Sequence, residues 1–281
     1  MDAKIAVFAL TFALIGLAGD DSAAIMAKVA DNVEKAAETR SRYVYHQVIR
    51  SSLVRANGQI ARKERREYSV IPAPGTSEKK LTGFNGEYRQ GGRMVSYSEP
   101  GFKYKGLDAD GDLMRDLTRE LTDSTDSRDG IPPSLFPLHK TALLSYDFKL
   151  NGQTEVDGRK TYRILFEPKV TSVCFVDEGC DASWKGEAWV DAEEFQPVRV
   201  QTDLAFKVPW GVRIFLGINL RRTGFSVRYV RVAENVWFPK TYGSEFQFQV
   251  LWGYKRTMTL SLESDGFRKT EVDSKIEFAP F

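Results

Sequence analysis

The side chains able to do metal or nucleophilic chemistry are few in this chain and lie far apart. The 281 residues include only two histidines, His46 and His139, and two cysteines, Cys174 and Cys180. The cysteine spacing, CFVDEGC, does not match that of a zinc knuckle. No G-x-S-x-G elbow, P-loop or dinucleotide fingerprint occurs. The sequence therefore predicts a protein that is not an enzyme and that needs no cofactor.

A short run of alternating carboxylates has some features of a calcium site. Asp108, Asp110 and Asp112 alternate in DADGD as calcium ligands do. An EF-hand loop, however, needs Gly at its sixth position and Glu at its twelfth, where this chain has Leu113 and Arg119. We therefore expect a turn that caps the following helix, and no metal. The acidic residues in DAD, DEG and EE lie in expected loops, where solvated charge is the simplest interpretation.

The beginning of the chain indicates export. The apolar run IAVFALTFALIGLAG spans 5–19. It is shorter than the roughly 20 residues that a membrane span needs, and it fits a signal peptide over 1–19. An uncleaved N-terminal anchor is the alternative. In an oxidising compartment, Cys174 and Cys180 are expected to form a disulfide that closes a hairpin tip. In a reducing cell they would stay unlinked thiols.

Composition limits the remaining function classes. Lys and Arg total 40 against 38 for Asp and Glu, and the charges are interspersed. Nucleic-acid binding is therefore not expected. With 42% hydrophobic and 12% aromatic residues, the chain can bury a full core. No internal repeat or linker is found, so 20–281 is predicted to form a single domain.

One amphipathic helix is predicted over 22–40. Ser22 or Asp21 can cap it, and Ile25, Val29, Val33 and Ala37 recur at four-residue spacing. Its expected role is to cover a sheet.

From Tyr43 onward, apolar and polar residues alternate with a period of two. Strands are expected at 43–49, 58–71, 78–90, 93–99, 143–150, 160–168, 184–190, 198–206, 212–220, 225–232, 237–252, 256–263 and 274–278. The NG pairs at 57–58 and 151–152 are predicted turns. This pattern predicts a mainly β (α+β) fold, a large antiparallel meander. The Pro- and Gly-punctuated segment 100–140 includes a helical stretch and is predicted to be a lid or insertion.

Two architectures share this strand pattern. In an outer-membrane β-barrel the apolar side chains would face lipid, whereas in a soluble half-barrel they would line a concave face covered by helices. The helix at 22–40 and the segment 100–140 have no natural place in a simple barrel wall, so the half-barrel is favoured.

Several stretches resemble the periplasmic outer-membrane lipoprotein carrier (lipoprotein-sorting) superfamily. They are AAIMAKVADNVEKAAETRSRYVYHQ, YRILFEPK and GEAWVDAEEFQPVRVQ, and the order of elements is similar over most of 22–278. The resemblance implies a strand ending at Asp191, a turn, and a strand starting near Pro197. It also implies a curved antiparallel sheet whose apolar hollow receives acyl chains and is plugged by helices.

This resemblance and the alternating aromatic residues together suggest where a ligand would lie. The residues expected to line the hollow are Tyr162, Phe166, Trp189, Phe246, Phe248 and Trp252. Strand parity puts Trp189 on the face opposite Ala188 and Val190, so only one of these sets can look inward. For any single ring, an ordinary place in the core is the simpler interpretation.

The function expected from the sequence is that of an exported periplasmic carrier or sensor of a lipid acyl chain or a lipoprotein. Its partners would be a lipid or acylated protein and an envelope protein, with at most transient membrane contact. The alternative is a structural or interaction domain of a cell-envelope complex, whose hollow is filled by its own side chains.

Overall fold

The computed structural model describes residues 21–71, 78–122, 138, 140–169, 184–205, 221–250 and 253–270. Its helices are α1 (Ser22–Arg40), α2 (Ala109–Thr122) and α3 (Lys140–Leu143). Its strands are β1 (Tyr43–Arg55), β2 (Ile60–Ile71), β3 (Glu78–Gln90), β4 (Arg93–Tyr97), β5 (Tyr146–Val156), β6 (Arg159–Pro168), β7 (Trp184–Asp191), β8 (Pro197–Leu204), β9 (Arg221–Ala233), β10 (Val236–Val250) and β11 (Tyr254–Lys269). Among these described helices, none is both long and apolar enough to cross a membrane.

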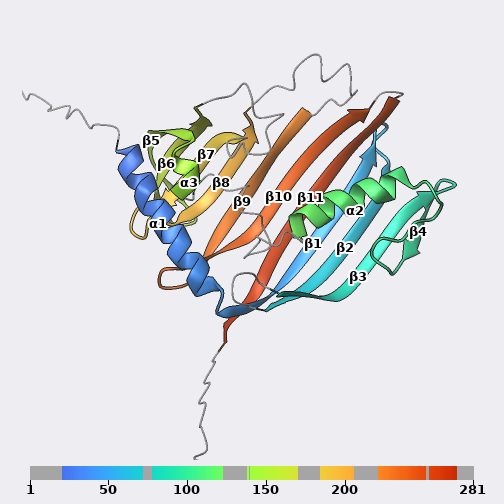
Figure 1. The fold of residues 1–281 in the computed structure, drawn as a ribbon, viewed down its shortest axis with the longest axis horizontal. Helices are drawn as coiled ribbons and strands as arrows, with labels where there is room; N and C mark the ends of the chain where they lie inside the picture. The colour runs from blue at the N-terminus through green and yellow to red at the C-terminus, as the bar shows by residue number, and fades with distance from the viewer. Residues whose placement is uncertain are drawn as a thin grey trace, which may run out of the picture.

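The described strands form one antiparallel sheet in the order β4-β3-β2-β1-β11-β10-β9-β8-β7-β6-β5. The sheet is curved and open, with α1 and α2 lying across one of its faces (Figure 1). The predicted half-barrel is therefore confirmed. The sheet consists of two meanders, β1–β4 and β5–β11, which the antiparallel β1–β11 ladder joins. The sequence predicted a simple meander of consecutive strands, which does not contain the pairing of β1 with β11.

The two faces of the sheet differ in what covers them. We call the face that carries the buried apolar cluster and the helices the inner face, and the opposite one the outer face. On the inner face α1 contacts β5 and β10, and α2 contacts β1 and β2. The predicted helix at 22–40 is confirmed, and its buried stripe is wider than expected because Met26 and Ala30 join Ile25 and Val29.

The start of α1 is attached to the sheet by a side chain. Asp21 makes no side-chain cap hydrogen bond. The Ser22 hydroxyl instead donates to the Phe148 carbonyl of β5 at 2.9 Å. The expected local cap is thus replaced by a contact with the edge of the sheet.

The two predicted NG turns have different outcomes. Gly58 has φ 81° in the β1–β2 turn, as predicted. At 151–152 the expected turn is wrong, because β5 continues through these residues with a register shift between Leu150 and Gln153. The chain reverses at Asp157 and Gly158, with φ of 52° and 78°, the left-handed pair that a type I′ turn requires. Asn151 and Gly152 form a bulge, where Gly152 takes φ 84°.

Several predictions fall outside the described residues. They are the leader at 1–19, the strands at 212–220 and 274–278, and the disulfide between Cys174 and Cys180. Within 100–140, the described part contains the predicted helix as α2.

Candidate ligand-binding face

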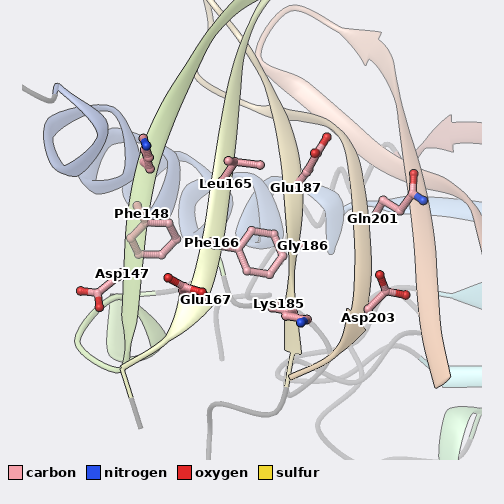
Figure 2. A pocket seen from close by; sticks show the side chains of 11 residues that line it. Asp147, Phe148, Leu165, Phe166, Glu167, Lys185, Gly186, Glu187, Gln201 and Asp203 are labelled. Carbon is pink, nitrogen blue, oxygen red and sulfur yellow. The ribbon is translucent and has the colours of Figure 1, made fainter. Parts of the chain in front are cut away.

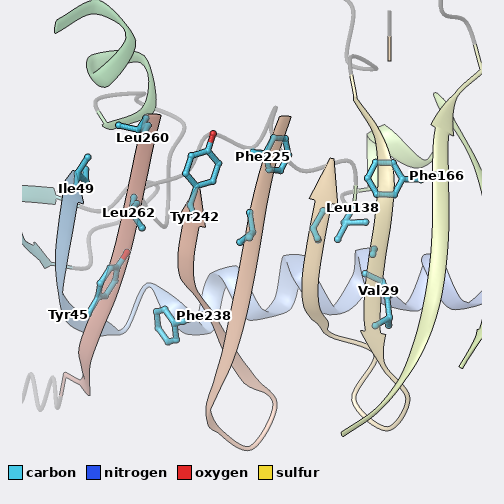
Figure 3. Packing of buried hydrophobic residues seen from close by; sticks show 14 of the residues in the cluster. Val29, Tyr45, Ile49, Leu138, Phe166, Phe225, Phe238, Tyr242, Leu260 and Leu262 are labelled. Atoms are coloured by element: carbon cyan, nitrogen blue, oxygen red, sulfur yellow. The ribbon is translucent and has the colours of Figure 1, made fainter. Parts of the chain in front are cut away.

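A row of apolar side chains crosses the inner face from β5 to β1. Cross-strand pairing places its members side by side in the order Leu150, Ile164, Ala188, Val200, Val227, Tyr242, Leu262 and Ile49. We call these eight residues the apolar row. All but the half-buried Leu150 are at most 4% exposed. Figure 3 shows Tyr242, Leu262 and Ile49 projecting from neighbouring strands into the same cluster.

The helices supply the other side of this cluster. Ile25, Met26 and Val29 of α1 pack into it, as does Leu138, which is 1% exposed. Val29 and Leu138 lie near Phe166 in Figure 3. The cover is therefore made of apolar contacts, which are non-directional and scale with the area buried.

The β7–β8 turn holds α1 in place. Asn32 of α1 donates from Nδ2 to the Glu194 carbonyl at 2.8 Å, and Gln196 donates from Nε2 to the Asn32 carbonyl at 3.1 Å. The Lys28 ammonium lies 4.4 Å from the centre of the Phe195 ring. Phe195 itself has φ 50° and stacks on Tyr162, with ring centres 6.0 Å apart. The segment that links these strands thus positions the covering helix.

Asp191 organises this turn from a buried position. Its Oδ1 accepts the backbone N–H groups of Glu193 at 3.1 Å and Glu194 at 2.8 Å, while Arg159 Nε donates to Oδ2 at 2.5 Å. Burial by itself raises the pKa of Asp191. The hydrogen bonds from Arg159 and the two amides outweigh burial and hold that pKa below its usual value of 3.8. β7 ends at Asp191 and β8 begins at Pro197, as the resemblance implied.

A buried charged cluster occupies the inner face beside the apolar row. We call Arg62, Glu64, Arg66, Tyr97 and Asp108 the polar network. Arg62 donates from Nη1 to Asp108 at 2.8 Å and from Nε to the Tyr97 hydroxyl at 2.7 Å. Tyr97 donates to Glu64 at 2.5 Å, and Arg66 Nη2 donates to Glu64 at 2.7 Å. Two acids balance two bases, and all five residues are at most 8% exposed.

Tyr97 is fixed in the polar network by its ring and by its hydroxyl. Its ring covers Gly86 so closely that a Cβ at position 86 would lie 2.2 Å from a ring carbon. Burial raises the pKa of Tyr97, the charge of Glu64 raises it further, and Arg62 opposes both. The phenol therefore stays neutral and serves as a donor to Glu64.

The polar network also fixes the start of α2. Asp108 Oδ1 accepts the Gly111 N–H at 3.0 Å, which confirms the predicted helix cap. Asp110 accepts hydrogen bonds from the Tyr254 hydroxyl at 2.6 Å and from Arg256 Nε at 2.8 Å. The first turn of α2 is thus bound to both β2 and β11.

The prediction that paired carboxylates are merely solvated is wrong at two places. In DAD, Asp108 is 1% exposed and bound to Arg62. In EE, Glu194 accepts hydrogen bonds from Trp237 Nε1 at 2.5 Å and from Arg231 Nε at 2.7 Å. The polar network was missed altogether, although Arg62, Glu64 and Arg66 recur at the two-residue spacing that puts them on one face of a strand.

The structure sorts the predicted site residues by face. Tyr162 and Phe166 flank Ile164 on the inner face, and Phe246 joins them there because it is paired with the buried Met258. Trp189 is corrected to the outer face. Its strand neighbours Ala188 and Val190 are fully buried on the inner face, and its ring lies 5.0 Å from the Arg199 guanidinium. Phe248 is a β10 residue paired with Arg256, but its side chain, like Trp252, lies outside the described part of the chain.

Metal-ligand clusters and the two histidines were the other candidates for chemistry in the sequence. No group of three or more His, Cys, Asp or Glu side chains placed to hold a metal ion occurs within them. His46 lies on the outer face, with Nδ1 3.2 Å from Asp265 and Nε2 3.5 Å from Glu67. It is half-exposed, as its place in an alternating strand predicted. His139 lies outside the described residues.

No protein-family model and no curated protein sequence matches this chain. Among solved structures, it is similar to one described as an outer membrane lipoprotein-sorting protein domain from Vibrio parahaemolyticus, with 10% identity and a TM-score of 0.35 over 89% of this chain and 95% of that one. A DUF1329 family protein from Desulfovibrio piger matches with 14% identity and a TM-score of 0.35, over 92% and 95% of the two chains. A LolA superfamily protein from Nitrosomonas europaea matches with 13% identity and a TM-score of 0.33, over 88% and 96%. The fold assignment rests on the sheet and helices of this chain themselves.

Proposed function

We propose that this protein is an exported, non-enzymatic carrier or sensor that holds a hydrophobic ligand against the inner face of its sheet. The ligand would be a lipid acyl chain or the acyl chain of a lipoprotein. The apolar row carries this proposal, because it offers a continuous apolar surface over eight strands. An acyl chain binds to such a surface by burial, at roughly 25 cal/mol per Å² before the costs of association.

At the β3–β4 end of the inner face, apolar side chains are left partly uncovered. This supports the proposal that the ligand enters there. Leu81 is paired with the buried Tyr68, and Val95 is paired with the buried Tyr88, so both lie on the inner face. Leu81 is nevertheless 40% exposed and Val95 is 36% exposed. An apolar chain could therefore make its first contact at β3 and β4.

The helices would act as the movable cover. α2 is fixed through polar contacts of its capping residue Asp108 and of Asp110 in its first turn, and Met114 and Thr118 are fully buried further along it. A single helix packed on the sheet can move away from it at a lower cost than the strands can separate. In this proposal α2 is the lid, and α1, held by the β7–β8 turn, is the more permanent cover.

The proposed location is the periplasm of a cell envelope. The apolar segment at 5–19 supports export, and in the periplasm Cys174 and Cys180 would form a disulfide. A lipid or an acylated protein would be the cargo, and an envelope protein would deliver or receive it.

A second function is favoured by a specific observation. Residues at the centre of the apolar row, such as Val200 and Val227, are fully buried. A self-filled core with no exchangeable ligand would have the same property, and the protein would then be a structural or interaction domain of an envelope complex.

The deciding experiment is native mass spectrometry of the protein purified from a periplasmic fraction, with lipid extraction of the same sample. A stoichiometric lipid or acylated protein would support the carrier. A ligand-free mass, together with no uptake of added fatty acid, would contradict it and favour the self-filled core.

A matched pair of variants tests the entry site. Leu81→Glu puts a charge on the inner face, whereas Ile71→Glu puts it on the outer face at a residue of similar exposure, 37%. We expect Leu81→Glu to slow uptake of a fluorescent fatty acid and Ile71→Glu to leave it unchanged. Equal effects would contradict entry at β3 and β4. Deletion of 109–122 should shorten ligand retention, and unchanged retention would contradict the lid.

A further inference from the structure

A groove lies on the outer face of β5–β8, away from the proposed ligand. Its volume is about 480 Å³, and it is lined by Asp147, Phe148, Lys149, Leu165, Phe166, Glu167, Lys185, Gly186, Glu187, Gln201 and Asp203. Figure 2 shows it on the side of these strands opposite α1. We call it the outer groove. Four carboxylates and two lysines line it, so its net charge is negative.

Several charges elsewhere on the outer face have a partner of opposite charge on a neighbouring strand. Lys63 bonds to Glu87 at 3.1 Å, and Arg50 lies 3.4 Å from Glu263. Within the outer groove, one lining carboxylate is paired as well, because Arg163 donates two hydrogen bonds to Glu187, of 2.9 and 2.6 Å. Opposite charges on adjacent strands, directly across the ladder as in Lys63 and Glu87 or on a diagonal as in the other two pairs, stabilise an exposed sheet face.

The outer groove departs from that arrangement. Asp147 of β5 and Glu167 of β6 are directly opposite each other, a like-charge pair that destabilises a sheet. Lys185 and Asp203 are opposite each other on β7 and β8 but form no ion pair. Among the described residues, Asp147, Glu167 and Asp203 have no ion-pair partner, and all three are exposed. Local rules are broken in this way mainly at functional sites.

An apolar side chain lies among these charges. Leu165 of β6 projects from the outer face two residues before Glu167 and lies opposite Lys149. A lysine or arginine from another molecule could lay its aliphatic stem along Leu165 while its charged end reaches Asp147 and Glu167. The combination of apolar floor and unpaired carboxylates fits a long basic side chain better than it fits a small cation.

We propose that the outer groove is a docking site for an extended segment of a partner protein that inserts a lysine or arginine between Asp147 and Glu167. This inference does not depend on the inner-face ligand. The segment would bind through side chains and not by adding a strand to β5. The Ser22 hydroxyl already occupies the Phe148 carbonyl, and the bulge between Leu150 and Gln153 interrupts the strand.

The test uses the full folded chain and fluorescent peptides in which lysines alternate with serines, with a matched peptide carrying glutamates in place of the lysines. We expect fluorescence anisotropy to show binding of the lysine peptide only. The double variant Asp147→Asn, Glu167→Gln should weaken this binding about fivefold or more. Glu245→Gln is the matched control, because Glu245 is an exposed outer-face carboxylate of β10 with no ion-pair partner among the described residues.

Three outcomes would overturn the proposal. They are no binding of the lysine peptide at millimolar concentration, equal binding of both peptides, and an equal loss in Glu245→Gln. A thermal melt provides an independent check, since removal of the like-charge pair should raise the Tm of the double variant. A lower Tm would show that these carboxylates have partners in the folded protein and would also contradict the proposal.

Discussion

Two neighbouring regions of the inner face are held together in opposite ways. Ile49 ends the apolar row on β1, and the next residue across the sheet is Arg66 of the polar network. On one side of this boundary, packing is non-directional and can adapt to a guest. On the other side, each contact has a fixed partner and geometry, such as Arg62 with Asp108 and Tyr97. The difference suggests a division of labour in which the apolar row binds and the polar network positions α2.

The largest expected effect comes from breaking the polar network at Arg62. Its side chain is 1% exposed, so Arg62→Ala leaves Asp108 as a buried charge without its basic partner and removes one of the two arginines beside Glu64. We expect a loss of about 3–5 kcal/mol in the free energy of unfolding, measured by urea denaturation. Arg65→Ala is the control on the same strand, because the Arg65 side chain is 45% exposed on the outer face. Similar losses in both variants would contradict the structural role of the polar network.

A smaller loss in the free energy of unfolding is expected in the apolar row. A truncated side chain there leaves a cavity but no unpaired charge. Ile164 is fully buried, and Ile164→Ala should lower the free energy of unfolding by about 3 kcal/mol, with Ile164→Val costing about 1 kcal/mol. If the row is a ligand surface, bound fatty acid should restore part of the stability of Ile164→Ala by filling the cavity. A ligand-independent loss would indicate a self-filled core.

The buried Tyr242 of the apolar row should make the stability of the protein fall at alkaline pH, and Tyr242→Phe should remove this effect. Burial raises the pKa of Tyr242 to about 12. Since this folded-state pKa is above the unfolded value of 10, the neutral phenol contributes stability that is fully present below pH 10 and falls as the pH rises towards 12. Tyr242→Phe should therefore lose less stability than the wild type between about pH 9 and pH 12. Parallel stability curves for the two proteins would contradict this.

The smallest effect is expected on the outer face. The Arg50 and Glu263 side chains are 49% and 48% exposed and 3.4 Å apart. Arg50→Gln should change the free energy of unfolding by less than about 1 kcal/mol, and added salt should remove the difference. The effect of Arg62→Ala should persist in salt, because buried charges are poorly screened. An effect of Arg50→Gln above that of Ile164→Val would reverse the expected order.

Much of the fold could be predicted from local pattern. The alternation of Tyr162, Ile164 and Phe166 identified a strand with one buried face, and the spacing of Ile25 and Val29 identified α1. These signals are readable because side-chain direction repeats every two residues in a strand and every 3.6 in a helix. The cap of α2 at Asp108 was likewise a local feature.

Predictions that needed long-range information were less successful. Asn151-Gly152 and Asp157-Gly158 both have turn chemistry, and only the pairing of β5 with β6 decides that the first is a bulge. Trp189 is as apolar as its neighbours, but the burial of Ala188 and Val190 puts it on the outer face. The spacing of the polar residues of β2 puts them on one face, but their burial could not be predicted because their partners, Tyr97 and Asp108, lie tens of residues away in the sequence.

The sequence by itself determined the mainly β fold class, the covering helix and the apolar character of one sheet face, because these follow from periodicity within each segment. Only the tertiary structure decided that β1 joins β11, that Arg62 is neutralised by Asp108, and that Asp147 lies opposite Glu167. Each of these depends on which distant strands become neighbours. Strand pairing is decided by the packing of the whole sheet, and it cannot be predicted from the pattern of apolar and polar residues within one segment.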